Sequence, residues 1–285
     1  MADILAPPGH RSFSQIKTYL HCAHQYRLAR VLRYQETPAW YLAGGSAVHE
    51  VVEHLTRQYA TDRTQPDPDT ILQLWLEAWD ANVTRNEQES GVPTDQWRAA
   101  GRVTKDKPNK EDGDWWANEG YQMCLRYAGW IVQSDMLVYE DDEGPWVERG
   151  MTVPINGVMV KMFVDAVFVL NGGELLVVDH KTGSRTPDAT QLRLYAQGMA
   201  AAGHPRPSLG AYWMSRSGEL TAPSVLGDGF DPVLGSMFRH VDLAIRGGIY
   251  PPNVGTHCVS CGVNKFCAAY GGAESENDPI REEGV

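Results

Sequence analysis

Residues 164–183 read VDAVFVLNGGELLVVDHKTG, and this stretch decides the fold. Its two apolar, β-branched runs are typical of strands, and the Asn-Gly-Gly turn at residues 171–173 predicts a β-hairpin. The hairpin would bring Asp165, in the first strand, next to Asp179, near the end of the second. Because strand side chains alternate with a period of two, Asp179 and Lys181 would share one face. The stretch therefore predicts two carboxylates and a lysine close together.

The neighbouring segments extend this hairpin into a sheet. Residues 147–155 and 158–170 are also apolar and β-branched, and the Asn-Gly pair between them predicts a second hairpin. Residues 188–203 then show helical spacing, and residues 208–215 form a further strand. The helix supplies the crossover that a parallel strand pair needs. We therefore expect an α/β fold with a small mixed sheet flanked by helices.

Two helices are predicted before the sheet. The first begins near Ser12 or Ser14, either of which could cap it. The second is predicted to begin at Gly44-Gly45-Ser46, and it places His49 at the border of an apolar stripe. A histidine in this position is more often an ordinary helix residue than a metal ligand.

The length of 285 residues fits one large domain better than several independent ones. We expect a single domain over residues 1–270 with a helical insertion at about residues 62–142. The remainder, residues 271–285, is acidic and is predicted to be a disordered tail.

Composition limits the classes of protein that need be considered. No apolar run approaches the roughly 18 residues of a membrane span, and the N-terminus does not resemble a signal peptide. We therefore expect a cytoplasmic protein that does not bind membranes. The net charge of −11 argues against a protein that coats nucleic acid nonspecifically, since such proteins usually carry a broad basic surface. Any contact with nucleic acid must then be local.

The residues of the hairpin fit phosphodiester cleavage. This reaction needs a divalent cation held by oxygen ligands, a water activated beside it, and a positive group that offsets charge on the phosphate. Asp165, Asp179 and Lys181 offer these groups. An isolated Asp-x-Lys is usually only a polar strand end entering a turn. Here the triplet follows four apolar residues and pairs with an aspartate one hairpin upstream, which favours a metal site.

The order of these motifs resembles that of the RecB-like nucleases of the PD-(D/E)xK superfamily. In that family a strand-borne Asp precedes (D/E)-x-K-T-G, and a helix with Q-L-x-x-Y follows. This chain has Asp165, then DHKTG at residues 179–183, then QLRLY at residues 191–195. The upstream family pattern G-x-x-x-H-x-x-x-E is matched at residues 45–53, where His49 is the histidine.

The resemblance implies a restriction-endonuclease-like fold and a set of site residues. Lys181 would be catalytic together with the two aspartates, and Gln191 and Tyr195 would bind the DNA strand. Magnesium or manganese would be bound by His49, Asp165, Asp179 and the backbone carbonyl of His180.

The cysteines form a second constellation. The chain has five, of which three form a C-x2-C-x5-C motif at residues 258–267, while Cys22 lies at the end of the first helix. Because cytosolic thiols stay reduced, clustered cysteines indicate a metal or a cluster. The spacing alone is compatible with zinc, with His257 or His24 as a fourth ligand, or with iron–sulfur. It matches neither ferredoxin pattern.

A lone N-terminal cysteine combined with this C-terminal motif resembles the iron–sulfur branch of the RecB-like nucleases, which includes AddB and the exonucleases of CRISPR adaptation. The resemblance implies that a 4Fe–4S cluster joins the chain ends through residues 20–26 and 255–268. Its ligands would be Cys22, Cys258, Cys261 and Cys267.

The sequence thus predicts a metal-dependent deoxyribonuclease. Exonuclease action on single strands or DNA ends is favoured, because this is the family's commonest activity. A separate helicase, or a recombination or CRISPR partner protein, could act with it, and the pathway could be CRISPR adaptation, recombination or phage DNA processing. Two alternatives stay open: a nucleic-acid-binding or assembly subunit with the same fold that does not cleave, and a zinc-stapled protein in which the Asp-x-Lys block is coincidental.

Overall fold

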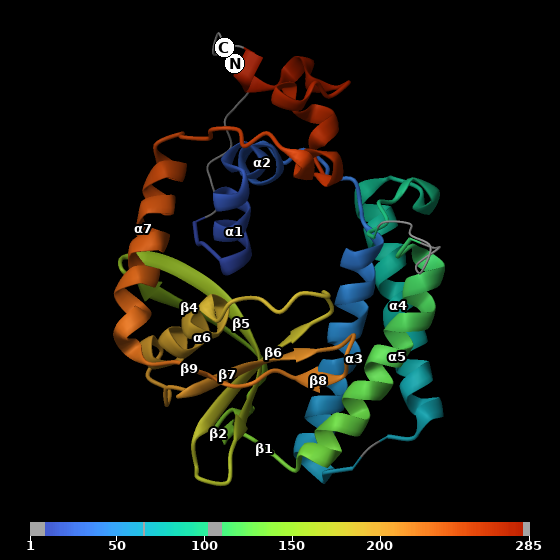
Figure 1. The fold of residues 1–285 in the computed structure, drawn as a ribbon, viewed down its shortest axis with the longest axis vertical. Coiled ribbons are helices and arrows are strands. Elements are labelled where there is room, and N and C mark those ends of the chain that lie inside the picture. The colour runs from blue at the N-terminus through green and yellow to red at the C-terminus, as the bar shows by residue number, and fades with distance from the viewer. Residues whose placement is uncertain (1–8, 65, 102–109, 282–285) are drawn as a thin grey trace. The chain divides into compact units, whose positions relative to one another are not determined.

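The computed structural model describes residues 9–64, 66–101 and 110–281 (Figure 1). The chain divides into two compact units. The first comprises Met1–Pro38, Thr152–Lys161 and Pro232–Val285, and the second comprises Ala39–Met151 and Met162–Asp231. The single domain over residues 1–270 stays a prediction.

A mixed sheet forms the centre of the fold. The predicted consecutive strands are β4 (Val147–Ile155), β5 (Val158–Val169) and β6 (Leu175–Lys181), and β7 (Leu209–Met214) follows the crossover helix. Strands β5 and β6 pair antiparallel, whereas β6 and β7 pair parallel. The predicted α/β class, with a mixed sheet flanked by helices, is therefore confirmed.

Short strands complete the sheet. Its order is β1-β5-β6-β7-β8, while β4 also pairs with β5 and β9 with β7. The short strands are β1 (Leu137–Val138), β8 (Glu219–Leu220) and β9 (Ser224–Val225), and a separate pair is formed by β2 (Glu140–Asp141) and β3 (Gly144–Pro145).

Three long helices of the second unit lie side by side (Figure 1). They are α3 (Trp40–Asp62), α4 (Pro68–Ser90) and α5 (Gly113–Ser134). Trp75 of α4 and Tyr127 of α5 belong to the same buried core as Trp213 of β7. The helices of the predicted insertion are therefore part of the main core.

The predicted start of the second helix at Gly44-Gly45-Ser46 is wrong, because α3 begins at Trp40. The glycines lie inside the helix and allow a close approach to α5. A Cβ atom on Gly44 would lie 2.2 Å from the Trp116 ring. Tertiary packing, and not a helix start, accounts for the glycine at this position.

Helix α6 (Thr190–Ala201) connects β6 to β7 and packs against both strands. A Cβ atom on Gly210 of β7 would lie 3.0 Å from Leu192 of α6 and 3.2 Å from Val177 of β6. The residues on either side of Val177 belong to the core beneath α3 to α5. Alternation along β6 thus presents one face to α6 and the other to the long helices.

One ion-pair network lies beside the short pair of strands. Asp141 accepts hydrogen bonds from Trp146 Nε1 at 2.7 Å and from Arg149 at 2.5 Å. Burial alone would raise the pKa of Asp141, but the hydrogen bonds from Trp146 and Glu143 and the charges of Arg149 and His204 outweigh it. The pKa of Asp141 is therefore lowered.

The first unit contains short helices and one longer one. Ser12, which is one of the two predicted caps, caps the first helix by accepting a hydrogen bond from Gln15 N at 3.3 Å. The helices are α1 (Phe13–His21), α2 (Ala23–Tyr26), the π-helical turn η1 (Arg27–Val31) and α7 (Asp231–Arg246). The 3-10 turns of this unit are η4 (Thr256–Ser260), η5 (Asn264–Phe266), η6 (Ala268–Tyr270), η7 (Ser275–Asn277) and η8 (Pro279–Arg281).

The predicted disordered tail is wrong for residues 271–281. This segment forms the turns η7 and η8, and Ser275 and Asp278 are each 1% exposed. The reason is that the Asp278 carboxylate has buried hydrogen-bond partners, whereas the acidic composition alone suggested a solvated chain. Glu282 and Glu283 lie outside the described residues. None of the described helices combines the length and apolar character needed to cross a bilayer.

Candidate functional site

The candidate site lies in the second unit, at the end of β6 and beside an open cleft. Residues of α3 and α4 line one part of this cleft, and Glu148, Asp165 and Thr182 line another. His49 of α3 also lines it, with 34% of its side chain exposed. The hairpin and α3 together thus bring the predicted residues to one place.

The carboxylate of Asp165 lies between two imidazole rings. Its Oδ2 atom is 3.7 Å from His49 Nδ1 and 3.6 Å from His180 Nδ1. The same oxygen accepts a hydrogen bond from the backbone N–H of His180 at 2.8 Å. One ligand atom from each of these three residues lies within 4.8 Å of the other two. A carboxylate with two imidazoles is a donor set that can hold a divalent metal ion.

The charged residues of this group shift one another's pKa values. Burial and the nearby charge of Asp179 raise the pKa of Asp165 to about 8. Burial alone would lower the pKa of His49, but the carboxylates of Glu148, Asp165 and Asp179 outweigh it and raise that pKa. Burial, followed by the charges of His49 and Lys181, lowers the pKa of His180 well below its usual value. This shift favours the neutral form of His180, which is the form in which imidazole binds metals.

A chain of hydrogen bonds holds the Asp179 carboxylate. Its Oδ2 atom contacts Lys181 Nζ at 2.5 Å, so the two side chains share one strand face as predicted. The Tyr195 hydroxyl donates to Asp179 Oδ1 at 3.0 Å and accepts from Gln191 Nε2 at 2.7 Å. Lys181 Nζ also donates to Gln191 Oε1 at 3.1 Å. The four side chains form a closed ring of contacts between β6 and α6.

The predicted ligand set is brought together with two differences. First, the ring of His180 lies beside Asp165, whereas the resemblance implied that His180 would bind the metal through its backbone carbonyl. Second, Asp179 is not part of the group within 4.8 Å, because Lys181 and Tyr195 hold its carboxylate. Tyr195 is only 4% exposed, so its predicted contact with DNA stays a prediction.

Glu148 was not singled out in the sequence. Its Oε1 atom lies 4.0 Å from His49 Nδ1, and it lines the same cleft as Asp165. Its backbone φ is +49°, a left-handed conformation that is uncommon for a residue other than glycine. Its position near the start of a predicted strand gave no sign of a site, because the contact depends on where α3 packs.

The four cysteines of the predicted ligand set come together in the first unit. One pocket is lined by Cys22, Cys258, Cys261 and Cys267. The backbone N–H groups of Gln25 and Asn253 donate to Cys22 Sγ, and that of Gly255 donates to Cys258 Sγ, each at 3.4 Å. Hydrogen bonds to sulfur are a feature of protein sites that bind metal through thiolates. The fifth cysteine, Cys124, is buried in the second unit.

The two histidines considered as zinc ligands lie differently. His257 lines the cysteine pocket, and its Nε2 donates to the Asn253 carbonyl at 2.8 Å. His24 instead bonds to Asp278, and these two residues form a second group with Cys267 in which ligand atoms lie within 4.8 Å of one another. Among the described residues, Cys22, Cys258 and Cys261 do not belong to any group whose ligand atoms all lie within 4.8 Å of one another.

Comparison with known proteins shows the family. The family model of the PD-(D/E)XK nuclease superfamily matches residues 10–268, and the chain therefore belongs to this superfamily. Nucleases of this superfamily depend on divalent metals such as magnesium or manganese, and their fold suggests DNA as the substrate. The ordered motifs around Asp165 and Lys181 lie within the matched range.

Two curated relatives come from phages. The chain is 25% identical to the Gene 69 protein of Mycobacterium phage D29, over 91% of this chain and 97% of that protein. It is 28% identical to the Gene 69 protein of Mycobacterium phage L5, over 91% of this chain and 96% of that protein. The crystal structure of SSO0001 aligns over 90% of this chain and 95% of that chain, at 12% identity and a TM-score of 0.35. That similarity is too loose to carry an argument about the fold.

Proposed function

We propose that this protein is a magnesium- or manganese-dependent deoxyribonuclease that acts as an exonuclease on single strands or DNA ends. The observation that carries the proposal is the placement of Asp165 between His49 and His180, directly beside the Asp179–Lys181 pair. A metal-binding group next to a lysine can supply the activated water and the positive charge that phosphodiester hydrolysis needs.

The residues present fit a divalent cation. His49, Asp165 and His180 would bind it, joined by Asp179 and the His180 carbonyl as the family resemblance implies. Bound there, the ion would lower the pKa of a water molecule and offset charge on the phosphate. Because imidazole suits transition metals better than magnesium, we expect manganese to support cleavage at lower concentration than magnesium.

The neighbouring side chains have separate roles in this proposal. Lys181 would orient the attacking water and stabilise charge that develops on the phosphate. Gln191 holds the ammonium group of Lys181, while Tyr195 holds the carboxylate of Asp179. A contact of Gln191 or Tyr195 with the DNA strand follows from the resemblance only.

The decisive experiment is a cleavage assay with the wild type and with Lys181→Ala. We expect metal-dependent cleavage by the wild type and loss of cleavage in the variant, while Lys17→Ala serves as a matched surface control. Lys181 is 26% exposed in its side chain, so the substitution should leave the fold intact, as circular dichroism would show. Cleavage at the wild-type rate would remove this lysine from the mechanism.

The choice of substrate tests the exonuclease part of the proposal. Linear single strands should be degraded, whereas covalently closed circular single strands should survive. Rapid cutting of the circles would make the protein an endonuclease. A wild type that binds DNA but cleaves neither substrate would instead support the non-cleaving alternative. The phage origin of both curated relatives favours phage DNA processing over CRISPR adaptation as the setting.

We further propose that the four cysteines hold a 4Fe–4S cluster. Support comes from their shared pocket, from the N–H donors to Cys22 and Cys258, and from the resemblance of their spacing. Anaerobically purified protein should be brown and contain iron and sulfide. Cys258→Ala should lose the colour, whereas Cys124→Ala, which changes a cysteine of the second unit, should keep it. A colourless wild type with stoichiometric zinc would overturn this part.

A further inference from the structure

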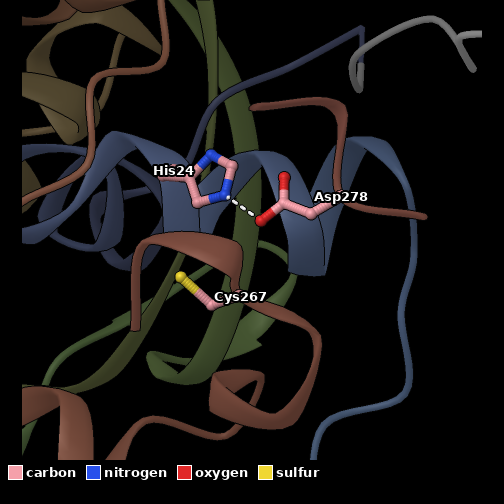
Figure 2. A group of neighbouring side chains, drawn as sticks. All are labelled: His24, Cys267 and Asp278. Atoms are coloured by element: carbon pink, nitrogen blue, oxygen red, sulfur yellow. Dashed lines mark hydrogen bonds and ion pairs between the residues drawn. The ribbon is translucent and has the colours of Figure 1, made fainter. Parts of the chain in front are cut away.

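A buried carboxylate from the C-terminal segment contacts the edge of the cysteine pocket. Figure 2 shows the His24 ring facing the Asp278 carboxylate, with the Cys267 side chain beside them. His24 Nε2 and Asp278 Oδ2 are 2.8 Å apart, and the side chains are 1% and 0% exposed. Both groups are thus removed from water, and they pair with each other.

The Asp278 carboxylate also holds two backbone groups. Its Oδ2 atom accepts from Ala268 N at 2.7 Å, and its Oδ1 atom accepts from Ile280 N at 3.1 Å. Ala268 directly follows Cys267, and His24 lies two residues after Cys22. One carboxylate therefore joins the two segments that carry cysteines from opposite ends of the chain.

The same three residues could be taken for a metal site, since their ligand atoms lie within 4.8 Å of one another. However, Asp278 Oδ2 already faces both His24 Nε2 and the Ala268 N–H. A metal ion at this oxygen would have to displace both contacts. The geometry fits a structural link better than a ligand set.

We infer that Asp278 and His24 form a clasp, a positioning pair that holds the Cys22 and Cys267 segments around the group bound by the four cysteines. This inference rests on the proposed cluster. The clasp would slow opening of the pocket and so slow loss of the cluster, because hydrogen bonds around metal ligands hold those ligands in place.

Asp278→Asn is the sharpest substitution. The carboxylate oxygens face one backbone N–H each, from Ala268 and Ile280, whereas an asparagine side chain offers only one oxygen. One N–H group must then face an NH2 group, which leaves a buried donor without an acceptor. Asp278→Glu restores two oxygens on a longer side chain and should recover part of the effect.

The experiment follows cluster loss from the full-length holoprotein. Iron release to a chelator and decay of the absorbance near 400 nm are measured at a temperature where circular dichroism shows every variant folded. We expect Asp278→Asn and His24→Asn each to release iron about 10–100-fold faster than the wild type. The double variant should be no faster than the worse single variant, because the two residues act as one unit.

Asp242→Asn is the matched control. Asp242 is buried in the same unit and pairs with Arg11 and Arg246, each at 2.7 Å. Its loss should lower the melting temperature without speeding iron release. If Asp278→Asn releases iron at the wild-type rate, or if the two clasp variants have additive effects, the inference is wrong. If the wild type carries zinc, the proposed cluster is wrong, and zinc release from the same variants tests the clasp separately.

Discussion

Replacing Tyr195 by phenylalanine removes one oxygen atom and tests how Asp179 is held. The Tyr195 ring is 4% exposed, and phenylalanine can fill the same space. The lost hydroxyl donates to Asp179 Oδ1 at 3.0 Å. A hydrogen bond to a charged group contributes about 1.5–3 kcal/mol, which corresponds to roughly 10–150-fold in an equilibrium constant. Loss of a hydrogen-bond partner of a metal ligand typically lowers metal affinity or activity by about 10–100-fold, so the two estimates agree.

The assay is a titration of cleavage with manganese at saturating single-stranded DNA. We expect Tyr195→Phe to need about 10–100-fold more manganese for half-maximal activity, with a smaller change in the KM for DNA. If Tyr195 contacted DNA directly, its replacement would instead raise the KM for DNA and leave the manganese requirement unchanged. The same titration thus separates a role in positioning Asp179 from the DNA contact that the family resemblance implies.

Tyr212→Phe provides the control for this substitution. Tyr212 is the parallel-strand partner of Asp179 and is 2% exposed, but its hydroxyl donates to the Asp188 carbonyl at 2.8 Å. The same chemical change on the neighbouring strand should leave the manganese requirement unchanged. A wild-type manganese requirement in Tyr195→Phe, or an equal loss in both variants, would refute the reasoning.

Two further predictions concern stability. Gly44→Ala should lower the free energy of unfolding by about 1–3 kcal/mol, the usual range for overpacking, because its Cβ would lie 2.2 Å from the Trp116 ring. Gly129→Ala should raise that free energy by about 0.5–1 kcal/mol, since its Cβ would make only an ordinary contact with Gln133 at 4.0 Å. Urea unfolding of both variants would show whether the two substitutions change the free energy in opposite directions. The lowered pKa of Asp141 stabilises the fold above the ordinary aspartate pKa of about 4, and this contribution is lost as the pH falls through the lowered value. Melting temperatures should therefore fall less steeply with acidification in Asp141→Asn than in the wild type, and parallel curves would contradict the assignment.

The hairpin could be predicted from sequence because its signals are local. Asn-Gly turns fix where strands end, and alternation along β6 places Asp179 and Lys181 on one face. The register of β5 on β6 pairs Ala166 with Val178. Asp165 and Asp179 are the next residues beyond this pair, so they are neighbours on adjacent strands. Nothing beyond the turn and the strand period was needed for this part of the site.

Other parts depend on contacts between segments that are distant in sequence. The ring of His180 reaches Asp165 on the opposite side of β6 from Lys181, and Glu148 reaches His49 only because α3 packs beside the cleft. The helix start at Gly44 was misplaced because its glycine serves packing against Trp116. The tail was misjudged because composition reports its charge but not the buried partners of Asp278.

The charge of the cleft constrains how DNA can enter it. Glu50, Glu53, Glu148 and Asp165 line the cleft, and Arg85 is the one lysine or arginine among the described lining residues. Burial, followed by the charges of Asp179 and Glu148, raises the pKa of Asp165. Phosphate would be repelled by such an acidic surface. A divalent cation relieves this repulsion and presents a positive centre to the phosphate at the same point. In the proposed mechanism the metal would therefore help to admit the strand as well as to cleave it, in a protein whose net charge is −11.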